Sequence, residues 1–186
     1  MVALVIALVM KAFVAQAFYI PSASMVPQLR VDDRIVVSKL SYRLHDPRRG
    51  DIVVFDCPPG ADCTLRKPRH DILPVRLLRD LGEGVGLLQP RRDEFIKRVI
   101  GLPGEIVQGR GGDVYVDDRR LVEPYLPTGV RTSNFPPTRV PAGTLWVMGD
   151  NRGNSEDSRR FGPIIRGTVV GRTVFRIWPL QHAAFL

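Results

Sequence analysis

The sequence predicts a mostly β protein that follows one N-terminal transmembrane helix, and three observations support this. Sixteen prolines and seventeen glycines interrupt the 186-residue chain. Between them lie short runs rich in Val, Ile and aromatic residues, a pattern typical of strands joined by turns. The first twenty residues differ from the rest because they form one nearly uninterrupted apolar segment. The rest of the chain is long enough for one domain with a buried core.

The apolar segment over residues 2–20 reads VALVIALVMKAFVAQAFYI, with Lys11 as its one charged residue. Nineteen residues at the helical rise span roughly 28 Å, about the thickness of a bilayer core. Lys11 costs roughly 2.5–3.5 kcal/mol at the bilayer centre unless its amine reaches the interface. We therefore expect a transmembrane anchor over residues 1–20. Two alternatives stay open: a buried core helix, and a cleaved secretory signal, since Ala15-Gln16-Ala17 fits the small-x-small cleavage pattern.

Six later segments have the character of strands, and turn residues bound nearly all of them. In chain order they are RIVVSKL (34–40), DIVVF (51–55), EFIKRVIG (94–101), DVYVDD (113–118), TLWVMGD (144–150) and TVVGRTVFRIW (168–178). Only VRLLRDLGEGVGLL (75–88) has a helical pattern, which its glycines weaken.

The expected domain covers residues 21–186 and contains two irregular stretches. Residues 56–93 are rich in Pro, Arg and Gly and predict an insertion between two core strands. Residues 106–143 combine hairpin-like pieces with a Pro-rich stretch and predict a small second β lobe. Cys57 and Cys63 are close enough in the chain to form a disulfide in an oxidising compartment, and two unrelated thiols are the alternative.

The chain carries a formal net charge of +8, from Lys and Arg residues that are scattered along the sequence. Because no basic stripe with interleaved aromatic residues is present, we expect no nucleic-acid partner. The charge instead suits contact with anionic lipid headgroups, or solubility. The three histidines are dispersed and, with the two cysteines, lack the spacing of a zinc site. We therefore expect no metal and no cofactor.

A pair of serines directly follows the apolar segment, in PSASMVP (21–27). Pro21 and Pro27 disfavour a helix here, and an extended chain would turn Ser22 and Ser24 to the same side, about 7 Å apart. A Ser-rich linker behind an anchor is one interpretation. The other is a nucleophile, but a serine hydroxyl is a poor nucleophile at neutral pH and requires a base.

His45, His70 and His182 are the first candidates for that base. The first two are followed by Asp, yet both lie in loop-like surroundings. No GxSxG elbow surrounds either serine of the pair, so a Ser-His-Asp triad lacks support.

Lys97 is the better candidate for the base. In the predicted strand 94–101 it shares a face with Phe95 and Val99, so a basic side chain lies in an apolar row. A buried lysine can lose its proton, whereas an arginine cannot. Moving a lysine pKa from about 10.4 to near 8 requires roughly 3 kcal/mol, which burial can supply. A solvated lysine on an edge strand is the alternative.

The stretch GDNRGNSEDSRRFGP (149–163) is dense in Gly, Asn, Asp and Ser, as a structured polar turn should be. Ser155 could hydrogen-bond and orient a lysine amine there. Asp157 and Arg159 could pair and brace the loop, although a solvated hairpin loop would have a similar composition.

Four motifs recur in a fixed order behind the apolar segment: PSASMVPQL (21–29), RGDIVVF (49–55), KRVIGLPGE (97–105) and GDNRGNSEDSR (149–159). Together they resemble the bacterial type I signal peptidases, membrane-anchored Ser/Lys endopeptidases that cleave secretory signal sequences. The resemblance implies an antiparallel β-sheet catalytic core with a small second lobe, preceded by one transmembrane helix. It also implies cleavage after small-x-small sites in secretory preproteins, on the extracytoplasmic face of the bacterial cytoplasmic membrane.

By that resemblance Ser24 is the nucleophile and Lys97 the general base. The Ser22 hydroxyl and the Ser24 backbone N–H would form the oxyanion hole, Ser155 would orient Lys97, and Asp157 with Arg159 would support the loop. The implied substrate-binding residues are Phe18, Ile20, Pro21, Met25, Phe95 and Ile96. Ala23 and Gln28 depart from the family pattern, which often has Gly and Thr there, and neither touches the proposed chemistry.

Two other functions stay open from the sequence. A self-cleaving repressor-type Ser/Lys protease would use a related dyad, but such proteins are soluble and joined to a DNA-binding domain. A non-catalytic anchored protein could use its charge to bind anionic lipid, and it would not need Ser24 and Lys97.

Overall fold

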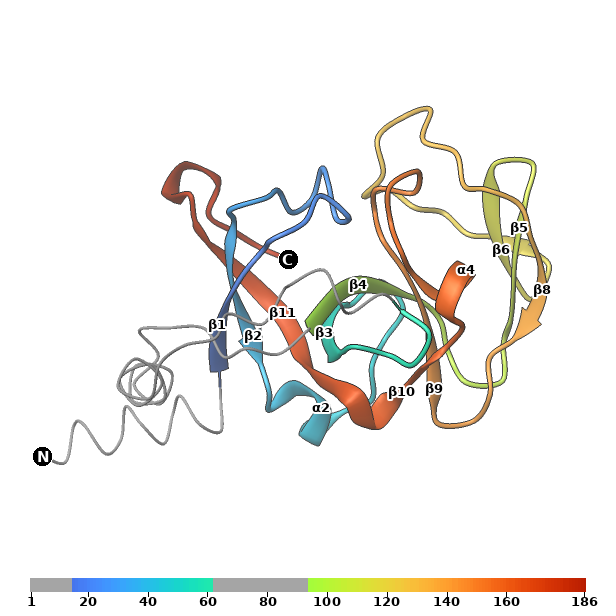
Figure 1. Cartoon of the computed structure of the whole chain (residues 1–186), viewed down its shortest axis with the longest axis horizontal. Coiled ribbons are helices and arrows are strands. Elements are labelled where there is room, and N and C mark those ends of the chain that lie inside the picture. The colour runs from blue at the N-terminus through green and yellow to red at the C-terminus, as the bar shows by residue number, and fades with distance from the viewer. Residues whose placement is uncertain (1–14, 62–93) are drawn as a thin grey trace, which may run out of the picture.

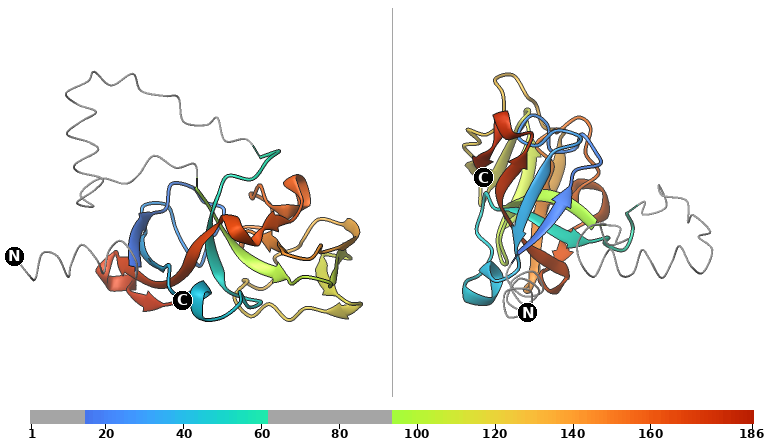
Figure 2. Two further views of the ribbon diagram at one scale, coloured as in Figure 1. Left: turned by 90° about the horizontal axis from the view of Figure 1, so that it is seen from below. Right: turned by 90° about the vertical axis from the view of Figure 1, so that its left-hand side faces the viewer.

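The computed structural model describes residues 15–61 and 94–186 (Figure 1). They form two antiparallel sheets, which confirms the mostly β expectation. The larger sheet has the order β1-β2-β11-β3-β4-β9-β10, with β12 paired to β11, and the smaller has the order β7-β6-β5-β8. Figures 1 and 2 place the smaller sheet at the end of the molecule opposite β1.

The strands of the larger sheet are β1 (Ala15–Tyr19), β2 (Arg34–Ser38), β3 (Ile52–Asp56), β4 (Glu94–Gly101), β9 (Thr144–Met148), β10 (Ile164–Ile165), β11 (Val169–Trp178) and β12 (Ala184–Phe185). Those of the smaller sheet are β5 (Ile106–Arg110), β6 (Asp113–Val116), β7 (Arg119–Arg120) and β8 (Phe135–Arg139). The helices are short: α2 (Ser41–Leu44), α4 (Ser158–Phe161), and the 3₁₀ turns η1 (Arg166–Thr168) and η2 (Leu180–His182). All six predicted strand segments therefore contain a strand.

The expected transmembrane helix over residues 1–20 is wrong for its last part, because Ala15–Tyr19 form strand β1. This strand pairs antiparallel with β2, so that Ala17 lies opposite Val36. Phe18 and Ile20 are buried while Ala17 is exposed, an alternation that suits a half-buried strand. Residues 1–14 lie outside the described residues. Within residues 15–61 and 94–186 no helix is long and apolar enough to span a bilayer.

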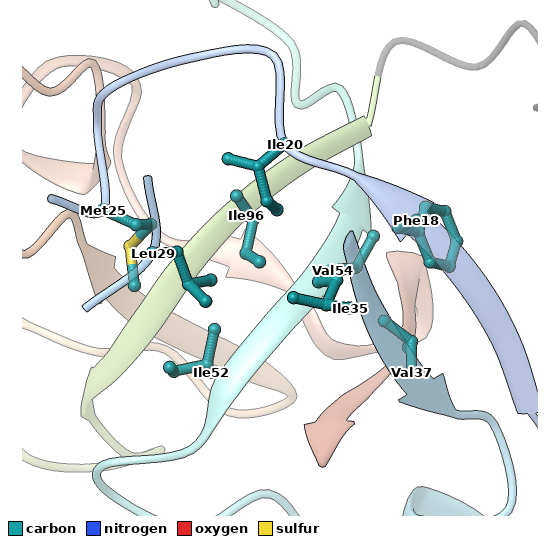
Figure 3. Close-up of a cluster of buried hydrophobic side chains, with 9 residues drawn as sticks. All are labelled: Phe18, Ile20, Met25, Leu29, Ile35, Val37, Ile52, Val54 and Ile96. Atoms are coloured by element: carbon teal, nitrogen blue, oxygen red, sulfur yellow. The ribbon is translucent and has the colours of Figure 1, made fainter. Parts of the chain in front are cut away.

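The serine segment is also not extended as expected, because residues 24–28 form turns. The Val26 N–H donates to the Ala23 carbonyl at 3.2 Å, and the Leu29 N–H donates to the Met25 carbonyl at 2.8 Å. This curl turns Met25 and Leu29 inward, where both are fully buried (Figure 3). Burying these two large side chains outweighs the preference of the flanking prolines for extended backbone.

Strands β3 and β4 run through the middle of the protein with both faces covered. One face, with Val54 and Ile96, belongs to an apolar cluster shared with β1, β2 and the serine turn (Figure 3). The other face, with Val53 and Val99, packs in a second cluster with β9 and β10. Burial on both sides explains why the strand sequences IVVFD and FIKRVIG are nearly continuous apolar runs.

A third apolar cluster joins the two sheets. It contains Ile100 from β4, Trp146 and Met148 from β9, and Val107 and Val114 from the smaller sheet. The small sheet is therefore fixed to the end of β4.

The insertion predicted over 56–93 falls mostly on residues 62–93, which lie outside the described residues. The same holds for the expected helix over 75–88, for His70 and for Cys63. Cys57, at the start of this stretch, is disulfide-bonded.

Candidate active site

Ser24 and Lys97 meet although 73 residues separate them in the chain. Lys97 lies near the middle of β4, and its Nζ donates hydrogen bonds to Ser24 Oγ at 2.9 Å and to the Ile96 carbonyl at 3.0 Å. The turn that carries Ser24 is held against β4 by its own apolar residues, since Met25 and Leu29 pack in the same cluster as Ile96 (Figure 3). Core packing thus brings the hydroxyl to the amine.

The Lys97 side chain is almost completely buried, with 3% of the residue exposed. Burial lowers the pKa of Lys97 from 10.5 to about 8, although the negative charges of Asp157, Glu156 and Asp150 act in the opposite direction. The ring centroid of Phe95 lies 5.3 Å from Nζ. An amine with this pKa is partly uncharged near neutral pH, and its lone pair can then accept the proton of Ser24 Oγ.

Ser22 is the outer member of the serine pair. Its Oγ lies 3.3 Å from Ser24 Oγ, and the residue itself is exposed. The curled turn therefore brings the two hydroxyls much closer than the extended chain we expected. In this place the Ser22 hydroxyl can donate a hydrogen bond to an oxygen that develops charge beside Ser24 Oγ.

The polar turn that follows β9 holds the backbone of the serine turn. The Asn151 N–H donates to the Ser24 carbonyl at 3.0 Å, and Asn151 Nδ2 donates to the Ala23 carbonyl at 3.1 Å. A Cβ at Gly149 would collide with the Ser24 carbonyl oxygen and with Ser155 Oγ, so only glycine fits this close approach. We assigned neither Gly149 nor Asn151 a role from the sequence, although both lie inside a motif that we recognised.

Ser155 lies beside this contact, but it makes no hydrogen bond to Lys97. Its buried Oγ has no hydrogen-bond partner among the residues that the structure describes. Its expected role in orienting the amine therefore stays a prediction. The expected pair of Asp157 and Arg159 is present, since Arg159 Nε and Nη2 each donate to the Asp157 carboxylate at 2.8 Å. Asp157 is fully buried and also accepts from the Gly149 N–H at 3.0 Å, which ties the pair to the turn.

The six expected substrate-binding residues do not form one group. Four of them lie in the apolar cluster under the serine turn: Phe18, Ile20, Met25 and Ile96. Phe95 lies on the face of β4 opposite Ile96, where its ring packs against Phe55 and Phe161 with centroids about 6 Å apart. Pro21 is exposed.

One half of β4 has an open edge next to the dyad. Strand β9 pairs with β4 only from Arg98 onward, at Arg98, Val99 and Gly101. In the described part of the chain, no strand pairs with Phe95–Lys97 on that side. Such an edge can accept another extended chain.

The histidines that the structure describes lie apart from the serine pair. The His45 ring Nδ1 is 2.9 Å from the Asp46 carbonyl, and the ring packs edge-on against Tyr42. His182 lies in η2, close to the C-terminus. Neither ring hydrogen-bonds to Ser24, so these two histidines do not form a triad with it.

Comparison with known proteins identifies the family of the chain. The family model described as "Signal peptidase, peptidase S26" matches residues 1–178. The chain is 40% identical to the signal peptidase I of Leptolyngbya laminosa over 178 residues, covering 96% of this chain and 76% of that protein. It is 42% identical to the probable signal peptidase I-1 of Synechocystis sp. (strain PCC 6803) over 182 residues, covering 98% and 81%. A crystal structure of a signal peptidase I from Enterococcus faecalis V583 has a TM-score of 0.47 and 26% identity, covering 69% of this chain and 97% of that one. The chain belongs to the signal peptidase family, peptidase S26.

Proposed function

We propose that the protein is a membrane-anchored serine endopeptidase that removes signal peptides from secreted preproteins, with Ser24 as nucleophile and Lys97 as general base. Membership of the signal peptidase family supports the reaction and the class of substrate. The observation that carries the roles is the 2.9 Å hydrogen bond between a buried lysine amine and a serine hydroxyl.

The chemistry depends on that contact. Uncharged Lys97 accepts the proton of Ser24 Oγ, and the oxygen attacks the carbonyl carbon of the scissile bond. The Ser22 hydroxyl and the Ser24 N–H stabilise the resulting oxyanion. The Lys97 ammonium then donates its proton to the leaving amine of the substrate, and Lys97 becomes uncharged again. Water, deprotonated by Lys97, then attacks the ester carbonyl carbon, and the Lys97 ammonium returns this proton to Ser24 Oγ as the acid product leaves.

The open edge of β4 supports an extended peptide as substrate. Backbone pairing beside Phe95–Lys97 would place the scissile bond next to Lys97, and alternate side chains of the peptide would face the protein. Ile20, Met25 and Ile96, three of the expected substrate-binding residues, belong to the buried apolar cluster under the serine turn. This environment suits the small residues of an Ala-x-Ala site.

The place of the site in the chain supports action at the membrane surface. Strand β1 follows residues 1–14 directly, and the ten residues from 14 to Ser24 reach at most about 36 Å, so the hydroxyl stays within that distance of the apolar N-terminus. Trp178, Leu180 and Phe185 are 49%, 73% and 86% exposed. They lie at the end of β11, which pairs with β2 next to β1. We infer a single-pass anchor, a catalytic domain on the extracytoplasmic face, and contact of these apolar side chains with lipid.

The first prediction concerns the dyad. In detergent or lipid, the full chain should cut a preprotein after its small-x-small site, and Ser24→Ala or Lys97→Ala should each lower the rate at least about 10⁴-fold. The reason is that the hydroxyl and the amine act as one unit. Electrophoresis and mass spectrometry of the products measure the rate and the cleavage position.

Histidine variants are the matched controls for the dyad variants. His45→Ala and His182→Ala should cleave at the wild-type rate. Retained cleavage in folded Lys97→Ala would contradict the proposed dyad and favour a different base. A wild-type chain that does not cleave would instead favour a non-catalytic role in lipid binding.

The second prediction concerns the oxyanion. Ser22→Ala should lower kcat by roughly 10²–10³-fold with little change in KM, because its hydroxyl stabilises charge that exists only in the transition state. Ser41→Ala, in α2, is the control and should keep the wild-type kcat. Steady-state kinetics with a fluorogenic signal-peptide substrate measures both constants. A wild-type kcat in Ser22→Ala would remove its hydroxyl from the mechanism.

The third prediction concerns stability. With the pKa of Lys97 at about 8 in the folded protein and about 10.4 in the unfolded chain, burial of the ammonium costs about 3 kcal/mol at pH 7. Lys97→Met should therefore be inactive but more stable than the wild type at pH 7. Its advantage should shrink between pH 8 and pH 10.4, because the wild-type amine loses its proton first in the folded state. Thermal unfolding across this range tests the sign, and an advantage independent of pH would contradict it.

A further inference from the structure

A segment of the small lobe reaches across to the polar turn of the active site. This bridging segment, residues 121–134, joins β7 to β8. Its Glu123 carboxylate accepts hydrogen bonds from both Nη atoms of Arg152, one of them at 2.9 Å. The Arg152 side chain is 1% exposed and that of Glu123 10% exposed. Thr132 Oγ1, from the same segment, accepts from Arg152 Nη1 at 2.7 Å.

A second contact from the same segment reaches the neighbour of the proposed base. The Tyr125 hydroxyl donates to Glu123, and its ring lies 3.9 Å from the guanidinium carbon of Arg98. Arg98 follows Lys97 in β4 and holds the buried Asp150 carboxylate with two hydrogen bonds, of 2.8 and 2.6 Å. The bridging segment thus contacts both the strand of the base and the turn that faces the nucleophile.

The four consecutive residues Gly149–Arg152 connect the bridging segment to the backbone of Ser24. Arg152 Nε donates to the Gly149 carbonyl at 3.1 Å. Between these two residues, Asn151 holds the Ala23 and Ser24 carbonyls through its side chain and its backbone N–H. A displacement of the Arg152 side chain would therefore move the hydrogen-bond donors that fix the backbone of the nucleophile.

Glu123 also stabilises the buried positive charge of Arg152. Burial acts to lower the pKa of Arg152, but the hydrogen bonds and the charge of Glu123 outweigh it, so the pKa is raised. Removing one member of such a buried pair leaves an unpaired ion, whereas replacing both with apolar residues of similar volume is often neutral. This asymmetry allows stability and catalysis to be tested separately.

We propose that Glu123 and Arg152 are positioning residues, through which the small lobe holds the Gly149–Arg152 turn so that Ser24 Oγ stays within reach of Lys97. No hydrogen bond joins either side chain to Ser24 or Lys97. The inference rests on the proposed function and adds a role for the small lobe in turnover. A loosened turn misplaces the nucleophile, and errors of about 1 Å can lower a rate roughly 10²-fold.

The test compares four variants of the full chain in detergent: Glu123→Gln, Arg152→Met, the double variant Glu123→Leu/Arg152→Met, and Asp113→Asn. Asp113 pairs with Arg120 in the same lobe, but that pair is exposed, so this variant is the matched control. The thermal unfolding midpoint, kcat and KM are measured for each. Both single variants at the buried pair should unfold at lower temperature, and the double variant should return close to the wild-type midpoint.

In the double variant, kcat should stay low although the unfolding midpoint returns close to the wild-type value. The double variant should keep a kcat at least about tenfold below the wild type, with KM within about twofold, while Asp113→Asn matches the wild type in all three measurements. Recovery of kcat together with the unfolding midpoint would overturn the proposal, because the pair would then serve folding alone. A raised KM with an unchanged kcat would overturn it as well.

Tyr125→Phe is a milder variant, and it tests the proposal if the double variant does not fold. It removes the hydroxyl that donates to Glu123 and keeps the ring over Arg98. Assayed well below its unfolding midpoint, it should show a several-fold lower kcat and an unchanged KM, and a wild-type kcat would overturn the proposal. A failure of the proposed function would give a different result, namely cleavage by the Ser24→Ala variant.

Discussion

The proposed chemistry depends on one contact, the hydrogen bond between the buried amine of Lys97 and the hydroxyl of Ser24. A lysine amine can accept the proton of a serine hydroxyl only while the amine is uncharged. Burial lowers the pKa of Lys97, so that part of the amine is uncharged near neutral pH. Burial is possible because β4 lies between two apolar clusters, with Ile96 on one face and Val99 on the other. The same packing that stabilises the sheet therefore prepares the proposed base.

Two kinds of contact place the nucleophile: apolar side chains of its own turn pack in the core, and polar groups of a neighbouring turn hold its backbone. Met25 and Leu29 fasten the serine turn to the core, and Asn151 holds the carbonyls of Ala23 and Ser24. Gly149 permits the close approach that this contact needs. Ser24 thus lies on a curled segment between β1 and β2, which fits the lack of a GxSxG elbow in the sequence.

Much of the large sheet was predictable because its strands are marked locally. The alternation of residues 94–101 placed Lys97 in an apolar row, and the turn residues around 34–40 and 144–150 marked strands that the structure contains. The order of four motifs then predicted the contact between Ser24 and Lys97, which no periodicity could supply across 73 residues.

The errors and omissions have physical causes of two kinds. An apolar run such as 15–19 fits a helix or a strand equally well, and its state is decided by pairing with β2, which begins fifteen residues after the end of β1. Likewise, the prolines around Ser24 indicated extended chain, but the burial of Met25 and Leu29 favoured a turn. The bond between Glu123 and Arg152 joins residues 29 apart and leaves no pattern in the sequence. Phe95 lies on the opposite face of β4 from Ile96, and its role in substrate binding stays a prediction.

Direct titration of Lys97 tests the central claim. The chain has four lysines, so labelled side-chain resonances in detergent micelles can be resolved by NMR, and Lys97→Arg identifies the signal that belongs to Lys97. The account predicts a titration midpoint near pH 8 for that signal. A midpoint near the ordinary lysine value of about 10.4 would mean that the amine stays charged at working pH and cannot be the base.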